Sequence, residues 1–172
     1  QDRELDVLIR QRDTGLVRTA RQLIETRQGD AAASTMEQLA RWYKSMGNSL
    51  AADTLARSAM ATASAPLVKA RVLSTAALPA ADLGRLQEAL EHTVQAEALI
   101  DTSAQSGLFA RILANRAYAL FKSGLLDSAA SVGRSALERF QALNDTLAVM
   151  QASSTLAAVA TTQNDLTTAI TL

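Results

Sequence analysis

Apolar residues recur at intervals of three and four along much of the chain, which is the spacing of side chains on one face of a helix. The clearest of these stripes consist of Met36, Leu39, Ala40 and Tyr43, of Leu86, Leu90 and Val94, and of Leu113, Ala117 and Leu120. No segment shows the sustained alternation of β-branched and polar residues that is typical of a strand. The pattern therefore predicts a protein built from amphipathic helices.

Composition favours the same fold class. Alanine, the best helix former, occupies 35 of the 172 positions, against seven glycines and two prolines. Aromatic residues make up only 3% of the chain, which disfavours a sheet protein. We therefore expect an all-α protein. Pro79 falls inside an expected helix, and because proline lacks the amide donor, we expect that helix to end early or to kink there.

A short pattern of small residues repeats along the chain. An alanine stands five and again twelve residues after a glycine in three copies: Gly47, Ala52 and Ala59; Gly84, Ala89 and Ala96; and Gly124, Ala129 and Ala136. Two partial copies flank them, namely Gly15 with Ala20 but Arg27 at the third place, and Asn164 with Ala169. The turn residues 15, 47, 84, 124 and 164 are thus separated by 32, 37, 40 and 40 residues. Because Gly and Asn most readily adopt positive φ at a helix end, this pattern predicts about five helix hairpins, with the alanines where helices cross.

The ends of the expected helices can also be read. Asp30, Asp101 and Asp145 stand where the first helices of hairpins should begin, and we expect them to be N-caps. At the other end of the chain, the last hairpin stops midway through its second helix. An apolar stripe there lacks a covering helix: Leu156, Val159, Leu166 and Ile170. We therefore expect a single repeat domain over residues 1–172 whose last repeat is truncated, in a parent protein that continues.

Turn glycine, alanine at +5 and +12, and a small residue seven before the turn (Ala77, Ala117) together resemble tetratricopeptide repeats. The segment 114–129 is the most similar, and the spacing resembles the longer variant of about 40 residues found in bacterial regulators and scaffold proteins. The usual Trp near the start of the repeat and the usual Pro closing the second helix are absent. The resemblance implies a right-handed α-solenoid of antiparallel helix-turn-helix repeats.

Charge and motifs exclude several function classes. Lys plus Arg and Asp plus Glu both number 17, so the strong positive excess of a nucleic-acid-binding domain is missing. The chain has no cysteine and one histidine, His92, which excludes thiolate and multi-histidine metal sites. Glu88, Glu91 and Glu97 are most simply hydrated surface residues. No phosphate loop or nucleophile elbow occurs, and no run of apolar residues is long enough to span a membrane. We expect no enzyme activity and no cofactor.

The resemblance implies that the first helices of the hairpins line a concave groove that binds a protein or peptide. The residues that it places there, and that we take as the candidate site, are Arg41, Lys44, Arg71, Arg111, Asn115, Tyr118 and Lys122. Five of these are cations, with Glu37 and Asp82 as nearby counter-charges, so the groove suits an acidic or amidated peptide segment. The alternative is that these are ordinary hydrated helix positions.

The sequence leaves two alternatives open on each of three points: the role of the chain, the packing of Trp42 and the compartment. Instead of a peptide-binding module, the chain could be the sensory or regulatory domain of a larger bacterial signalling protein, such as a sensor kinase or transcription regulator. Tyr43 falls on the packing stripe, whereas Trp42 lies one position off it and either packs against the neighbouring repeat or forms an exposed anchor. The absence of cysteine, the excess of Arg (14) over Lys (3) and the Gln1 start favour export to a bacterial periplasm, with the cytoplasm as the alternative.

Overall fold

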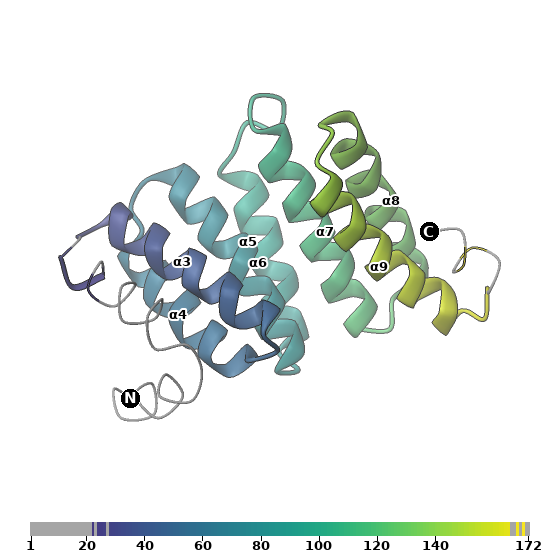
Figure 1. The fold of residues 1–172 in the computed structure, drawn as a ribbon, viewed down its shortest axis with the longest axis horizontal. Coiled ribbons are helices and arrows are strands. Elements are labelled where there is room, and N and C mark those ends of the chain that lie inside the picture. Colours follow the sequence, from purple (N-terminus) through teal and green to yellow (C-terminus); the bar gives the residue numbers. More distant parts are fainter. Residues whose placement is uncertain (1–21, 23, 27, 166–167, 169, 171–172) are drawn as a thin grey trace.

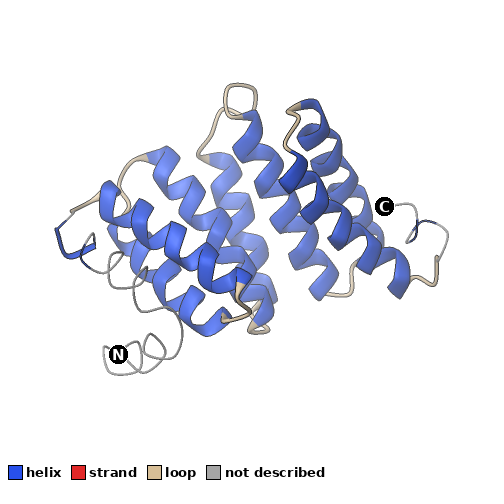
Figure 2. Ribbon diagram, viewed as in Figure 1, coloured by secondary structure: helices blue, strands red, loops and turns tan. Residues whose placement is uncertain are grey.

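A computed structural model describes residues 22, 24–26, 28–165, 168 and 170. Seven helices have both ends within these residues, and no strand occurs among them (Figure 2). The helices are α3 (Asp30–Ser45), α4 (Ser49–Thr62), α5 (Pro66–Asp82), α6 (Leu86–Ala98), α7 (Ser106–Lys122), α8 (Leu126–Ala142) and α9 (Thr146–Thr162). The predicted all-α class is confirmed.

Successive helices form hairpins that follow one another in chain order across the molecule, from α3 and α4 on the left of Figure 1 to α8 and α9 on the right. The hairpins are α3/α4, α5/α6 and α7/α8. The first helices, α3, α5, α7 and α9, also contact one another in sequence, and each second helix contacts the first helix of the next hairpin. We call α3, α5, α7 and α9 the first-helix layer.

The turn inside each hairpin has the same backbone geometry. Gly47, Gly84 and Gly124 have φ of 75°, 79° and 75°, and Asn164 after α9 has φ of 62°. In all four cases the helix ends two residues earlier, and the residue after the turn donates its N–H to the carbonyl five positions back, as Leu125 does to Leu120. These bonds satisfy helix-end carbonyls in the way that a left-handed terminal residue permits. Gly15 lies outside the described residues.

The repeated alanines lie where the helices meet. At the +5 and +12 places the exposed fraction is 0% for all six alanines of the complete copies: Ala52, Ala59, Ala89, Ala96, Ala129 and Ala136. Ala40, Ala77 and Ala117, seven before the turns, are at most 1% exposed. Full burial of so small a side chain means that neighbouring helices approach closely, which a larger side chain would prevent. Ala20, Arg27 and Ala169 lie outside the described residues.

Three expectations about the helices are wrong. The helix of Pro79 does not end early: α5 continues to Asp82, two residues before Gly84, as in the other hairpins. Because Pro79 is buried in the core and stands only three residues before the helix end, packing outweighs the single lost hydrogen bond. Two packing stripes also differ from expectation. Val94, expected on one of them, is 58% exposed, whereas Leu156 and Val159, expected to lack a covering helix, are buried.

The third error concerns helix starts. Asp145 is the N-cap of α9 and accepts from the N–H of Ala148 at 3.1 Å, as predicted. Asp30 instead lies inside the first turn of α3 and accepts from Ser64 N at 2.6 Å, which ties α3 to the α4–α5 connection. Asp101 accepts from Ser103 N within the loop, because α7 begins only at Ser106. Both aspartates therefore satisfy loop N–H groups rather than those of a helix beginning beside them.

Candidate functional site

The seven candidate residues all lie on the first-helix layer. Arg41 and Lys44 are on α3, Arg71 is on α5, and the remaining four are on α7. The structure divides them by partner: some pair with internal carboxylates, one is hydrogen-bonded between helices, and two have no counter-ion among the described residues.

Arg41 and Arg71 share one buried carboxylate, that of Glu37 on α3. Arg41 Nη1 lies 3.3 Å from Glu37 Oε1, and Arg71 Nη2 lies 3.5 Å from Oε2. The Thr75 hydroxyl on α5 donates to Oε1 at 2.9 Å. The Glu37 side chain is only 2% exposed, so these partners are what makes its burial tolerable. The sequence identified Glu37 as a counter-charge, but its burial was missed, because nothing local distinguishes it from a hydrated glutamate.

Lys44 and Tyr118 converge on a second carboxylate, Asp82 at the end of α5. The Tyr118 hydroxyl donates to Asp82 Oδ1, Lys44 Nζ lies 3.0 Å from Oδ2, and Ser49 Oγ donates to Oδ2 at 2.5 Å. Partial burial raises the pKa of Asp82, but the hydrogen bonds from Ser49, Tyr118 and Lys44 outweigh it and hold that pKa below its ordinary value. Lys44 Nζ also lies 5.4 Å from the centre of the Tyr118 ring. Asp82 therefore connects α3, α4, α5 and α7.

Asn115 is buried between α5 and α7. Its Nδ2 donates to the carbonyl oxygen of Ser74 at 2.7 Å and to Ser74 Oγ at 3.0 Å. The side-chain amide nitrogen is therefore occupied within the protein, and the contact ties the second and third complete hairpins together.

Arg111 and Lys122 remain. Lys122 is exposed at the end of α7. Arg111 is half-buried, and it has neither a hydrogen bond nor an ion pair with any residue that the structure describes. Burial lowers the pKa of the Arg111 guanidinium below its ordinary value. Repulsion from Arg41 and Arg71 acts in the same direction, and attraction to Glu37 and Asp145 opposes it.

The other half-buried arginines of the described chain differ from Arg111 in this respect. Arg71 pairs with Glu37, Arg85 pairs with Asp53 and Glu88, and Arg116 pairs with Glu97 at 2.5 Å. Removing an arginine from water without a carboxylate beside it is unfavourable. Among the half-buried arginines that the structure describes, Arg111 is therefore the one with no carboxylate within ion-pair distance.

The two aromatic residues of α3 pack inward. Tyr43 is 5% exposed in the core cluster of α3 and α4, and half-buried Trp42 packs against the same cluster. Their rings meet edge to face with centroids 5.0 Å apart. This arrangement favours the packing role of Trp42 over the exposed anchor.

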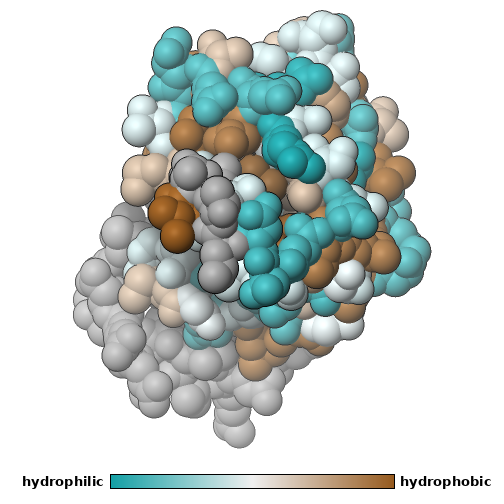
Figure 3. Space-filling model, turned by 90° about the vertical axis from the view of Figure 1, so that its right-hand side faces the viewer, coloured by the Kyte–Doolittle hydropathy of each residue, from teal (hydrophilic) through white to brown (hydrophobic). Residues whose placement is uncertain are grey.

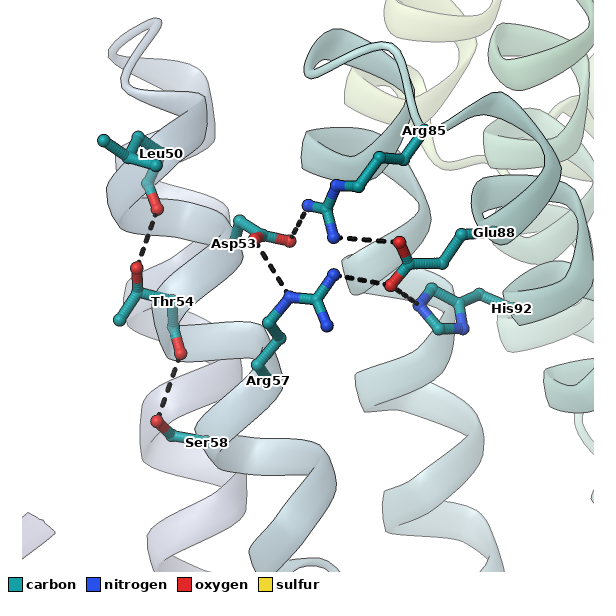
Figure 4. A network of polar contacts seen from close by, with 8 residues as sticks. All are labelled: Leu50, Asp53, Thr54, Arg57, Ser58, Arg85, Glu88 and His92. Carbon is teal, nitrogen blue, oxygen red and sulfur yellow. Dashed lines mark hydrogen bonds and ion pairs between the residues drawn. The ribbon is translucent and has the colours of Figure 1, made fainter. Parts of the chain in front are cut away.

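A second charged cluster joins the second helices α4 and α6 (Figure 4). Asp53 pairs with Arg85 and with Arg57, whose Nε lies 3.1 Å from Asp53 Oδ2. Glu88 accepts from Arg57 Nη2 at 2.6 Å and from Arg85 Nη1 at 2.9 Å, and His92 Nε2 lies 3.5 Å from it. Opposite charges thus neutralise one another, and the cluster ties neighbouring hairpins together rather than offering an open charge. The sequence alone treats Glu88 as hydrated. Its partner Arg85 is only three residues away, but Arg57, which completes the cluster, is 31 residues away.

The end of the molecule formed by α8 and α9 shows polar and apolar patches side by side (Figure 3). Leu147 and Met150 of α9 are 66% and 64% exposed. A hollow of about 180 Å³ lies between the two helices, with Leu156, Val159 and Arg134 among its lining residues. Within the described part of the chain, no group of three or more carboxylates or histidines is close enough to hold a metal ion. None of the helices described is both long and apolar enough to cross a membrane.

No model of a known protein family matches the sequence, and no curated protein matches it.

Proposed function

We propose that this chain is a right-handed α-solenoid of tetratricopeptide-like repeats of the longer variant, about 40 residues each. Hairpins that follow one another in contact support this proposal, as do the common geometry of the turns at Gly47, Gly84 and Gly124 and the complete burial of the alanines at +5 and +12. In such a superhelix the first-helix layer lines the concave surface.

We further propose that this surface binds an acidic segment of a partner protein. The observation that carries the proposal is Arg111, a half-buried guanidinium that has no counter-ion among the described residues. Three of the five candidate cations, by contrast, are already paired with Glu37 or Asp82. Anions are recognised best by cations that no internal carboxylate satisfies, since no existing ion pair must then be broken.

The position of Lys122 specifies the spacing of the acidic groups. Lys122 and Arg111 are eleven residues apart on α7, which is about three helical turns, so both project from the same side of the helix about 16 Å apart. An extended peptide advances roughly 3.4 Å per residue. Successive side chains of an extended segment point to opposite sides, so two carboxylates that both face α7 stand an even number of positions apart. Four positions span about 14 Å, which the long side chains of Arg111 and Lys122 can match.

A labelled Gly/Ser peptide with two glutamates four positions apart tests the proposal, with the same peptide carrying two glutamines as control. Fluorescence anisotropy should show binding of the glutamate peptide alone. The double charge reversal Arg111→Glu with Lys122→Glu should weaken it at least about tenfold, because two ion pairs worth up to about 1 kcal/mol each are replaced by repulsion. Circular dichroism should show unchanged helix content.

Charge reversal of Arg134, which is exposed on α8 outside the first-helix layer, controls for net charge. It should leave peptide affinity within about twofold of the original value. Unchanged affinity in the Arg111/Lys122 double variant would refute the proposed function.

A further inference from the structure

The contacts of Glu37 with Arg71 and Thr75 have a counterpart one hairpin later, in which the arginine is kept and the other two residues differ. Arg71 lies thirteen residues before the turn at Gly84, and Arg111 lies thirteen before the turn at Gly124. Thr75 follows Arg71 by one helical turn, and Asn115 follows Arg111 in the same way. The two pairs therefore occupy equivalent places on α5 and α7.

Their partners on the preceding first helix are also equivalent. Thr75 donates to Glu37, which lies ten residues before Gly47, and Asn115 donates to Ser74, which lies ten residues before Gly84. At this position α3 has the Glu37 carboxylate, which also pairs with Arg71. At the equivalent position α5 has the Ser74 hydroxyl, which carries no charge that could pair with Arg111.

This inference rests on the proposed function. We propose that a carboxylate of the bound segment takes, at Arg111, the place that the Glu37 carboxylate takes at Arg71. Arg111 then anchors the segment, while Asn115 and Ser74 are positioning residues that fix α7 against α5. The other carboxylate of the segment pairs with Lys122 at the far end of α7.

Charge on neighbouring residues agrees with this assignment. Arg41, Arg71 and Glu37 are close enough to Arg111 to interact with it electrostatically. Asp145 at the start of α9 also interacts with Arg111, so three guanidinium groups and two carboxylates leave one net positive charge there. Arg111 has no hydrogen bond with the described residues, and none of its side-chain nitrogens is completely buried. Solvent can therefore reach the guanidinium.

Two variants test the assignment with the two-glutamate peptide. Arg111→Gln should weaken binding about tenfold, since a charge-assisted hydrogen bond is lost, and Arg111→Lys should lose less, because charge remains but the planar fork does not. Ser74→Glu combined with Asn115→Thr copies the set of Glu37 and Thr75 into the next hairpin. Its internal carboxylate should compete for Arg111 and weaken peptide binding as much as Arg111→Gln does.

A double-mutant cycle identifies the contact. Replacing one glutamate of the peptide by glutamine should weaken binding to the original protein but not to Arg111→Gln, whereas replacing the other should weaken both. If the Ser74→Glu/Asn115→Thr variant does not fold, this cycle still decides the assignment.

The outcomes separate the two proposals. Failure of the unmodified protein to bind the peptide would refute the proposed function and the inference with it. Binding that Lys122→Gln weakens and Arg111→Gln leaves unchanged would keep the proposed function and overturn this inference. Equal loss of affinity in Arg111→Gln and in the Ser74→Glu/Asn115→Thr variant supports it.

Discussion

Alanine at the contact points decides how closely the helices of this protein approach one another. Ala59 on α4 is completely buried, whereas Ala61, two residues further along the same helix, is exposed. A methyl group at the first position occupies all the space there. The same residue type at the second position contributes only its helix propensity.

Ala59→Leu should therefore lower the free energy of unfolding by about 1–3 kcal/mol through overpacking. Ala61→Leu should change it by less than about 0.5 kcal/mol. Urea unfolding followed by circular dichroism measures both. Equal effects of the two variants would contradict close packing at the +12 position.

We expect His92 to make the stability of the fold depend on pH. Burial lowers its pKa below the ordinary 6.5; repulsion from Arg85 acts in the same direction, and Glu88 and Asp53 oppose it. The unfolded chain therefore takes up the proton first as the pH falls, so the contribution of neutral His92 is complete above pH 6.5 and is lost as the pH falls below that value.

His92→Phe keeps an aromatic ring in place and removes this titration. Urea unfolding between about pH 7 and pH 6 should show a smaller decrease in stability for the variant than for the original protein. An identical pH dependence in both would show that His92 does not contribute.

At the scale of the helix, the hairpin turn depends on a residue that accepts positive φ. Gly124 has φ of 75° with no atom near its missing Cβ, so only backbone strain opposes a side chain there. Gly107 lies inside α7 without positive φ, and the nearest atom to its Cβ position is 3.8 Å away.

Gly124→Ala should therefore destabilise the protein by about 1 kcal/mol, and Gly107→Ala should stabilise it by up to about 1 kcal/mol. Thermal unfolding should show a lower melting temperature for Gly124→Ala and a higher one for Gly107→Ala than for the original protein. A stabilising effect of Gly124→Ala would contradict the turn assignment.

The elements predictable from sequence are those with local causes. A turn glycine and an alanine five residues later act within one hairpin, so the positions of Gly47, Gly84 and Gly124 could be read directly. The N-cap prediction was wrong for Asp30 and Asp101, because an aspartate near a helix start can also accept hydrogen bonds from loop N–H groups, as both do here. Which of these it does depends on the conformation of the loop.

At the scale of the whole molecule, neighbouring hairpins are connected by carboxylates whose partners are distant in sequence. Glu37 is 38 residues from Thr75, and Asp82 is 36 residues from Tyr118. Sequence reasoning placed the cations of the candidate site on one surface, but it could not separate those already paired from Arg111. That distinction depends on the packing of α3, α5 and α7.

Asp82→Ala should lower the free energy of unfolding by about 2 kcal/mol, because Lys44, Ser49 and Tyr118 all lose a charged acceptor. Asp127→Ala, at an exposed carboxylate that accepts only from Gln163 among the described residues, should lower it by less than about 1 kcal/mol. Differential scanning calorimetry measures both, and equal effects would contradict the role of Asp82 as a connection between hairpins.

The central claim is that Arg111, which has no ion pair with the described residues, binds a carboxylate of an acidic partner. Side-chain NMR of arginine tests this claim most directly. In a titration with the two-glutamate peptide, the Nε–Hε signal of Arg111 should shift, while those of Arg57 and Arg85, already paired with internal carboxylates, should stay in place. Shifts confined to arginines other than Arg111 would contradict the account.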